Sequence, residues 1–221
     1  HLQRMFNGLQ YSNIDPGISQ DEVAKITLDV LGSNLPLLQP GDDYLVTQVV
    51  SVGNSPSSDS PDINIVIYCQ PIDFIPFARS YTTGVRIVTP STYGIIQNKE
   101  ADASEESAPQ QVYPLMTGQD GSITECRGGN FMFVSEGRIK LPDRRNVLPG
   151  VSMQTVIELA NNIGVPIDEG DYSIYDVYKC DEAFVSSTRN CMLPVATING
   201  LYIGGKVPGS VTSNLLESWR D

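Results

Sequence analysis

The chain has 221 residues, 40% of them apolar, and a formal net charge of −12. This length suits one large domain or two small ones. The acidic balance argues against a nucleic-acid partner, because phosphate backbones attract basic patches. No long uncharged apolar run is present, so we expect no helix that crosses a membrane.

The cysteines and the start of the chain bear on metal binding and location. The four cysteines form no Cys-x-x-Cys pair and only one histidine is present, so no metal site is predicted. No signal-peptide pattern is visible, which together with unpaired thiols predicts a cytoplasmic protein. Residue His1 already falls inside a helical pattern, from which we expect that the N-terminal part is incomplete.

Residues 1–72 are predicted to form two helices followed by two strands. Helically spaced apolar residues indicate a helix over 1–11, and a Ser-Gln-Asp-Glu capping box at 19–22 opens a second helix. Runs rich in β-branched residues predict strands over 44–52 and 63–68. We assign 1–72 to a small N-terminal α/β domain. Two prolines in 71–80 favour a linker, which we place at 73–82.

Residues 83–221 are predicted to form a larger domain of mixed strands and helices. Strands are expected over 85–88, 113–117, 123–124, 130–135, 138–141 and 181–186, and a hairpin over 192–203. A helix is expected over 152–163, capped by Ser152 and ended by Gly164, and another over 210–219. The polar, acidic segment 97–111 suits a helix end and a solvated loop. This order predicts an α+β (mixed α/β) fold in two lobes.

Three short segments of the second half could carry chemistry. The Leu-Pro-Gly-Val-Ser run at 148–152 opens a helix, and N–H groups at a helix start bind phosphate. The Ser-Ser-Thr-Arg turn at 186–189 could hold a phosphate or carboxylate. The carboxylate of Glu125, which precedes a glycine pair, could keep a pyridine nitrogen protonated. Taken alone, each segment is a weak signal: an ordinary capped helix is the favoured reading of the first and a polar loop that of the second, and a surface turn with a solvated Glu is the alternative for the third.

The order of these segments resembles one known family. Residues 120–131 (DGSITECRGGNF), 146–152 (NVLPGVS) and 181–188 (DEAFVSST) resemble motifs of the class IV aminotransferases. Leu-Pro-Val at 193–195, Ile-Asn-Gly at 198–200 and Pro-Gly-Ser-Val-Thr at 208–212 resemble the family's ending. Met153 stands where the family usually has Arg. In the first half only 1–6 (HLQRMF) resembles a family helix.

The resemblance implies a two-domain, fold type IV aminotransferase that is similar to branched-chain and D-amino-acid aminotransferases, with the small domain truncated. It implies pyridoxal 5'-phosphate as cofactor, an amino acid and a 2-oxo acid as substrates, and a homodimer. Position by position, Arg4 would pair with the cofactor phosphate and Glu125 with the pyridine nitrogen. Val151, Ser152 and Thr188 would also hold the phosphate, which makes 83–221 the cofactor-binding domain.

One family residue is not found where the resemblance places it. Class IV enzymes bond their cofactor to a lysine ahead of the Asp-Gly segment. An ungapped count puts this lysine near Arg86, Ile87 and Val88, so no catalytic residue is assigned. Lys99 is the only lysine between Lys25 and Lys140. Two hypotheses stay open: an active aminotransferase, or a homologue without the lysine that binds phosphate ligands or serves only as a subunit.

Overall fold

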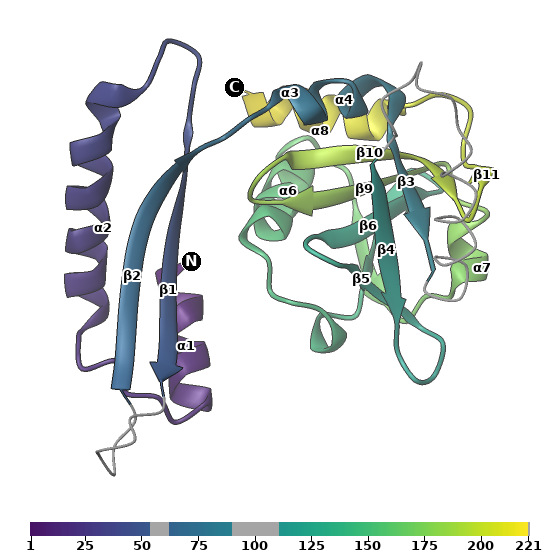
Figure 1. Ribbon diagram of the computed structural model, residues 1–221. Helices are drawn as coiled ribbons and strands as arrows, with labels where there is room; N and C mark the ends of the chain where they lie inside the picture. Colours follow the sequence, from purple (N-terminus) through teal and green to yellow (C-terminus); the bar gives the residue numbers. More distant parts are fainter. Residues whose placement is uncertain (54–61, 90–110, 221) are drawn as a thin grey trace, which may run out of the picture. The chain divides into compact units, whose positions relative to one another are not determined.

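The fold comes from a computed structural model that describes residues 1–53, 62–89 and 111–220. The chain divides into two compact units, His1–Asp73 and Phe74–Asp221. Both units combine helices with strands, which confirms the predicted mixed α+β class (Figure 1). In the described ranges no helix is both long and apolar enough to cross a membrane.

The first unit is a pair of helices and a β-hairpin. Its elements are α1 (Leu2–Tyr11), α2 (Gln20–Asn34), the short 3-10 helix η1 (Leu35–Leu37), β1 (Tyr44–Gly53) and β2 (Asp62–Pro71). The predicted capping box is present: Ser19 Oγ accepts from the Glu22 backbone N–H, and the Glu22 carboxylate accepts from the Ser19 N–H. This reciprocal pair satisfies two N–H groups that the helix itself leaves unpaired, and so fixes the start of α2.

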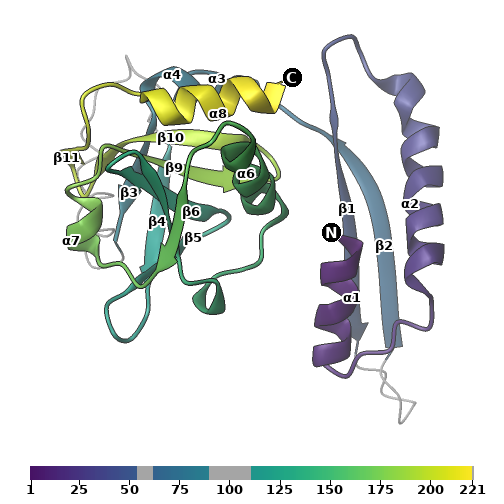
Figure 2. The same cartoon turned by 180° about the vertical axis from the view of Figure 1, so that it is seen from behind.

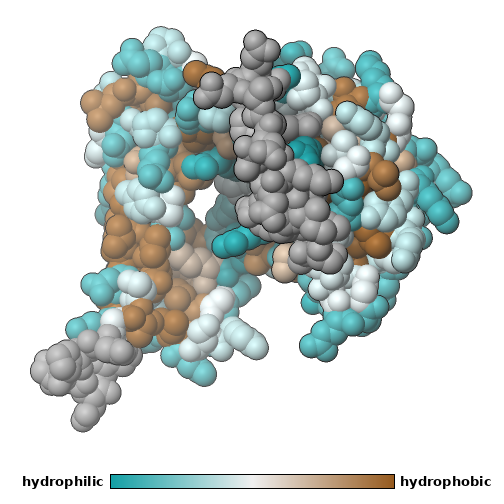
Figure 3. Space-filling view, turned by 45° about the vertical axis from the view of Figure 1, so that its right-hand side comes forward, coloured by the Kyte–Doolittle hydropathy of each residue, from teal (hydrophilic) through white to brown (hydrophobic). Residues whose placement is uncertain are grey.

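The hairpin has one face toward a helix and one that stays largely exposed. On the inner face Gln48 Nε2 donates to Thr27 Oγ1 of α2 (3.3 Å). On the outer face Val49 and Val66 lie opposite each other in the antiparallel register and are 41% and 50% exposed. Figure 3 shows hydrophobic residues at the surface of this unit. Alternation along each strand explains this pattern, because successive side chains point to opposite faces.

The second unit is built on one large sheet. Its described strands are β3 (Val85–Val88), β4 (Val112–Thr117), β5 (Ile123–Cys126), β6 (Asn130–Ser135), β7 (Arg138–Pro142), β8 (Ile167–Gly170), β9 (Glu182–Ser187), β10 (Cys191–Ile198) and β11 (Leu201–Tyr202). They lie in the order β5-β4-β3-β10-β9-β6-β7-β8, and β11 pairs with β10. Its helices are α3 (Ile75–Ala78), α4 (Ser80–Thr83), the 3-10 helix η2 (Arg144–Asn146), α6 (Val151–Asn162), α7 (Ile174–Val177) and α8 (Ser210–Arg220).

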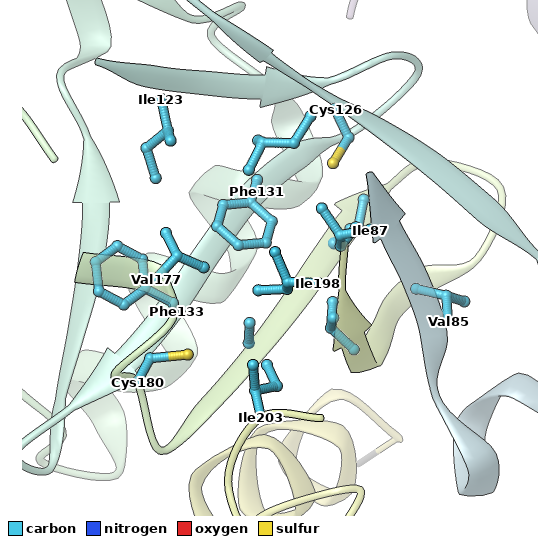
Figure 4. Packing of buried hydrophobic residues seen from close by; sticks show 14 of the residues in the cluster. Val85, Ile87, Ile123, Cys126, Phe131, Phe133, Val177, Cys180, Ile198 and Ile203 are labelled. Carbon is cyan, nitrogen blue, oxygen red and sulfur yellow. The ribbon is translucent and has the colours of Figure 1, made fainter. Parts of the chain in front are cut away.

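Two hydrophobic cores lie on the two faces of this sheet. One core is enclosed by the curled strands and centres on Phe131, Phe133 and Ile87 (Figure 4). The other lies between the sheet and helices α6 and α8, which Figure 2 shows on the same face. The alternating side chains of β6 supply both cores: Phe131 points to the first and Met132 to the second.

Several boundaries differ from the predictions. Two helical turns, α3 and α4, stand in the predicted linker 73–82, and β8 was not predicted. Ser152 is not the N-cap of α6: that position is Gly150, and Ser152 is a buried residue of the first turn. The predicted helix 152–163 ends one residue earlier, at Asn162, and Ile163 is its exposed C-cap. Residues 97–110 of the predicted acidic loop lie outside the described residues.

Candidate functional site

The Glu125 carboxylate is tied to the segment that leads into α6. Glu125 is half-buried near the end of β5. Its Oε2 atom accepts a hydrogen bond from the Leu148 backbone N–H (2.9 Å) and another from Asn130 Nδ2 (3.2 Å). Both bonds fall on one oxygen of the carboxylate. The other oxygen, Oε1, is therefore the one that could bind a ring N–H.

The start of α6 has the chemistry of an anion site. The helix begins directly after Gly150, and no side chain caps its first turn. The first N–H groups of an α-helix have no acceptor within the helix, and the helix dipole adds positive potential there. These N–H groups and the Ser152 hydroxyl belong to that first turn. Val151 is 39% exposed, whereas Ser152 is buried.

Close packing beneath this helix start depends on a glycine. A Cβ atom at Gly150 would lie 1.9 Å from Asn130 Oδ1, so no other residue fits there without a shift of the asparagine. Gly150 has ordinary extended angles (φ −69°, ψ 136°), so the requirement comes from space and not from backbone strain. A similar limit holds at Gly129, where a Cβ atom would meet the Ser186 carbonyl at 2.8 Å.

The turn that carries Thr188 lies at the same end of the sheet. Strands β6 and β9 are antiparallel, and Asn130 pairs with Ser186. Since Thr188 follows β9 by one residue, this register brings its turn next to the start of β6. The Thr188 backbone therefore lies two residues beyond the position opposite Asn130, whose side chain bonds to Glu125.

Hydrogen bonds with two tyrosines hold this turn in place. Tyr81 Oη donates to the Asn190 carbonyl (2.8 Å), and Asn190 Nδ2 donates to Tyr113 Oη (3.0 Å). Burial raises the pKa of Tyr81 to about 12, and burial also raises the pKa of Tyr113. Both phenols therefore stay protonated around neutral pH. The turn is closed by Ser187 Oγ, which donates to Asn190 Oδ1 (2.7 Å).

Glu182, although it lies in one of the motifs, has a structural partner. Its carboxylate accepts from the backbone N–H groups of Val211 (2.9 Å) and Thr212 (2.8 Å) at the start of α8. A carboxylate at a helix start offsets the helix dipole and satisfies unpaired N–H groups. This motif residue thus anchors the last helix to the sheet.

Of the predicted cofactor residues, four lie in the second unit and one does not. Glu125, Val151, Ser152 and Thr188 belong to segments that converge on Asn130. Arg4 lies on α1 in the first unit, and each unit is described by itself. Sequence reasoning missed the connecting role of Asn130. The signals available were its place after the glycine pair and within the motif at 120–131.

The position expected for the cofactor lysine holds other residues. Ile87 and Val88 are buried in β3, and Arg86 lies between the backbones of β10 and β4. Lys140 donates to Asp168 (2.8 Å) on the β7–β8 edge, so it serves an ion pair. Lys99 lies outside the described residues.

Pyridoxal phosphate has three groups that the protein must bind: the phosphate, the ring nitrogen and the carbonyl carbon. The described residues offer partners for the first two. The uncapped first turn of α6 matches the phosphate, and the free Glu125 oxygen matches the ring nitrogen. The third point, an amine for the carbonyl carbon, is not supplied by Arg86, Ile87 or Val88, where the resemblance places the lysine.

Comparison with known proteins agrees with this geometry. The family model described as amino-transferase class IV matches residues 1–198. The chain is 25% identical to a putative branched-chain-amino-acid aminotransferase of Methanocaldococcus jannaschii, over all of this chain and 80% of that protein. It is 26% identical to a D-alanine aminotransferase of Listeria monocytogenes, where the match spans 51% of this chain and 39% of that protein.

Solved structures show the same fold. The branched-chain amino acid aminotransferase of Escherichia coli superposes with a TM-score of 0.81 at 21% identity, over all of this chain and 77% of that one. The 4-amino-4-deoxychorismate lyase of Pseudomonas aeruginosa superposes with a TM-score of 0.74 at 20% identity. Since the second protein is named a lyase, the fold alone does not select the reaction.

Proposed function

The chain belongs to the class IV aminotransferase family, and from this premise we propose that it transfers an amino group between an amino acid and a 2-oxo acid with bound pyridoxal 5'-phosphate. Its relatives are named branched-chain-amino-acid and D-alanine aminotransferases. Because the match to the first of these covers the whole chain, we propose an amino acid of the branched-chain type as substrate.

One observation carries the proposal: the Glu125 carboxylate bonds to the segment that begins α6. The hydrogen bond from Leu148 N to Glu125 Oε2 is 2.9 Å long, and α6 begins three residues later at Val151. Three residues span at most about 10 Å of chain. A molecule the size of pyridoxal phosphate can bridge such a distance, with its ring nitrogen at one end and its phosphate at the other.

The proposed residues have separate tasks. When bound, pyridoxal phosphate supplies an electrophilic carbonyl carbon and an electron-withdrawing ring. Glu125 holds a proton on the ring nitrogen, because a nearby carboxylate favours the protonated form. The first-turn N–H groups of α6, together with Ser152 and Thr188, hold the phosphate. The resemblance also assigns Arg4 to a cofactor phosphate, for which a guanidinium fork is suited, and this role stays a prediction.

Two further properties belong to the proposal and rest on the resemblance. We expect a homodimer, and we expect the protein to act in the cytoplasm. The acidic chain is not expected to bind nucleic acid.

The experiment that tests the function is a titration of the whole chain with pyridoxal phosphate, followed by absorbance and then by borohydride. A covalent link to a lysine gives a visible band that borohydride removes, and Lys99→Ala should abolish it if Lys99 is that lysine. Lys25→Ala, an exposed change on α2, is the matched control. Consumption of a branched-chain amino acid with 2-oxoglutarate then measures amino transfer.

The outcomes separate the two hypotheses. A band that is lost in Lys99→Ala, with amino transfer in the unchanged chain, supports the aminotransferase. Saturable binding without any band or transfer would instead support a homologue that holds phosphate ligands without the lysine chemistry.

A further inference from the structure

We propose that Asn130 is a positioning residue. It fixes the position of Glu125, which would bind the ring nitrogen, relative to the start of α6, which would bind the phosphate. This inference rests on the proposed function, because it concerns the same cofactor site. In this role Asn130 does not itself contact the ring or the phosphate. It acts through Glu125 and through the segment that opens α6.

Asn130, Glu125 and Leu148 form a closed triangle of hydrogen bonds. Asn130 Nδ2 donates to Glu125 Oε2 (3.2 Å) and to the Leu148 carbonyl (2.9 Å). The Leu148 N–H donates back to the same Oε2 atom (2.9 Å). The amide nitrogen has two hydrogens, and both are used. One side chain therefore fixes the carboxylate and the backbone that precedes the helix at the same time.

The position of the Asn130 side chain is restricted by its surroundings. It is buried, its backbone pairs with Ser186 in the sheet, and its Oδ1 atom lies against Gly150. A buried amide that leaves its hydrogen bonds loses them without replacement by water, so alternative rotamers are disfavoured. The triangle thus has one stable geometry.

This geometry decides which carboxylate oxygen faces a ligand. With Oε2 committed to two donors, Glu125 can present only Oε1 to a ring nitrogen. The same bonds hold Leu148, and hence the start of α6, at a fixed place relative to that oxygen. Preorganisation of this kind lowers the ordering cost of binding at both ends. Loss of Asn130 should therefore weaken binding both at the ring nitrogen and at the phosphate. Loss of a residue that contacts the bound molecule directly should weaken binding at one of these points only.

The test uses three probes that need no lysine. Pyridoxine carries only the ring end, inorganic phosphate only the anionic end, and pyridoxine 5'-phosphate both. Their dissociation constants with the full chain are measured by calorimetry. Glu125→Gln should weaken the two ring-bearing probes, and Ser152→Ala the two phosphate-bearing probes. Asn130→Ala should weaken all three, by about tenfold for pyridoxine 5'-phosphate, as expected for the loss of about one hydrogen bond's net contribution.

A control variant separates positioning from simple loss of stability. Val156→Ala removes buried apolar volume from α6 one turn beyond the site, and should lower the unfolding midpoint without a change in the three affinities. The inference is overturned if Asn130→Ala weakens only one end, or if it moves the affinities no more than Val156→Ala does. If the unchanged chain binds none of the probes, the proposed function fails, and this inference fails with it.

Discussion

The substitution Gly150→Ala tests whether Asn130 is as firmly held as its hydrogen bonds indicate. The added Cβ atom would lie 1.9 Å from Asn130 Oδ1 and 3.1 Å from its Cγ atom, so one of the two groups must move. The backbone at Gly150 suits alanine, which leaves the asparagine as the source of any penalty. A flexible side chain would turn aside at little cost.

The magnitude follows from the bonds that Asn130 would give up. Displacement of its amide breaks one bond to a carbonyl, worth about 1 kcal/mol, and one to a carboxylate, worth about 1.5–3 kcal/mol. Alanine in place of glycine restores about 0.4–1 kcal/mol by restricting the unfolded chain. The free energy of unfolding of this unit should therefore fall by about 2–3 kcal/mol.

The assay is urea unfolding followed by the fluorescence of the single tryptophan. Trp219 packs on α8 against the core that α6 also joins, so its emission reports this unit. Gly205→Ala, where nothing lies within 4 Å of the added Cβ atom, is the matched control and should leave the midpoint almost unchanged. In an Asn130→Ala background, Gly150→Ala should cost nothing further. An equal cost in both backgrounds would refute the reasoning.

Three further predictions concern the frame around the site. Glu182→Gln should cost about 1 kcal/mol of unfolding free energy, because the first turn of α8 loses its charged acceptor, and an unchanged urea midpoint would contradict this. Hydrogen bonds from Arg138 and Lys140 lower the pKa of Asp168. The resulting stability is present above the ordinary Asp pKa of about 4 and is lost as the pH falls below it, so Asp168→Asn should flatten the acid side of the stability curve. Tyr81→Phe should remove a bond to the turn between β9 and β10, and amide exchange in that turn should become faster by a factor of about five, for about 1 kcal/mol.

Local signals predicted much of the fold from the sequence. The capping box at Ser19 and Glu22 is present as expected, because it depends only on residues three positions apart. Strand β6 was predicted from its apolar run, since both of its faces are buried. Such features depend on neighbours along the chain.

Other features depend on distant parts of the chain and could not be predicted. Ser152 is a favoured N-cap residue, yet the helix begins two residues earlier with its N-cap at Gly150, where the Asn130 side chain leaves no room for a Cβ atom. Strand β8 carries two acidic residues among its four, Asp168 and Glu169, and it forms because it pairs with β7 and because Asp168 binds the basic residues there. Charge and register, rather than strand propensity, determine this element.

In the candidate site, too, some features follow from the local sequence and others from contacts between distant residues. The resemblance assigned Glu125 and the helix start to one cofactor, but each motif alone also suited an ordinary turn or a capped helix, and no pattern indicated the residues that connect the two. Their connection runs through hydrogen bonds between residues 18 and 23 positions apart. Only the folded chain brings these groups together.

The most direct test of the central claim is a crystal structure of the chain with pyridoxal 5'-phosphate. We expect the phosphate oxygens to accept hydrogen bonds from the first-turn N–H groups of α6, and the ring nitrogen to lie about 2.7–3.2 Å from Glu125 Oε1. Density that places the phosphate at the helix start but the ring away from Glu125, or the whole molecule elsewhere, would contradict the account.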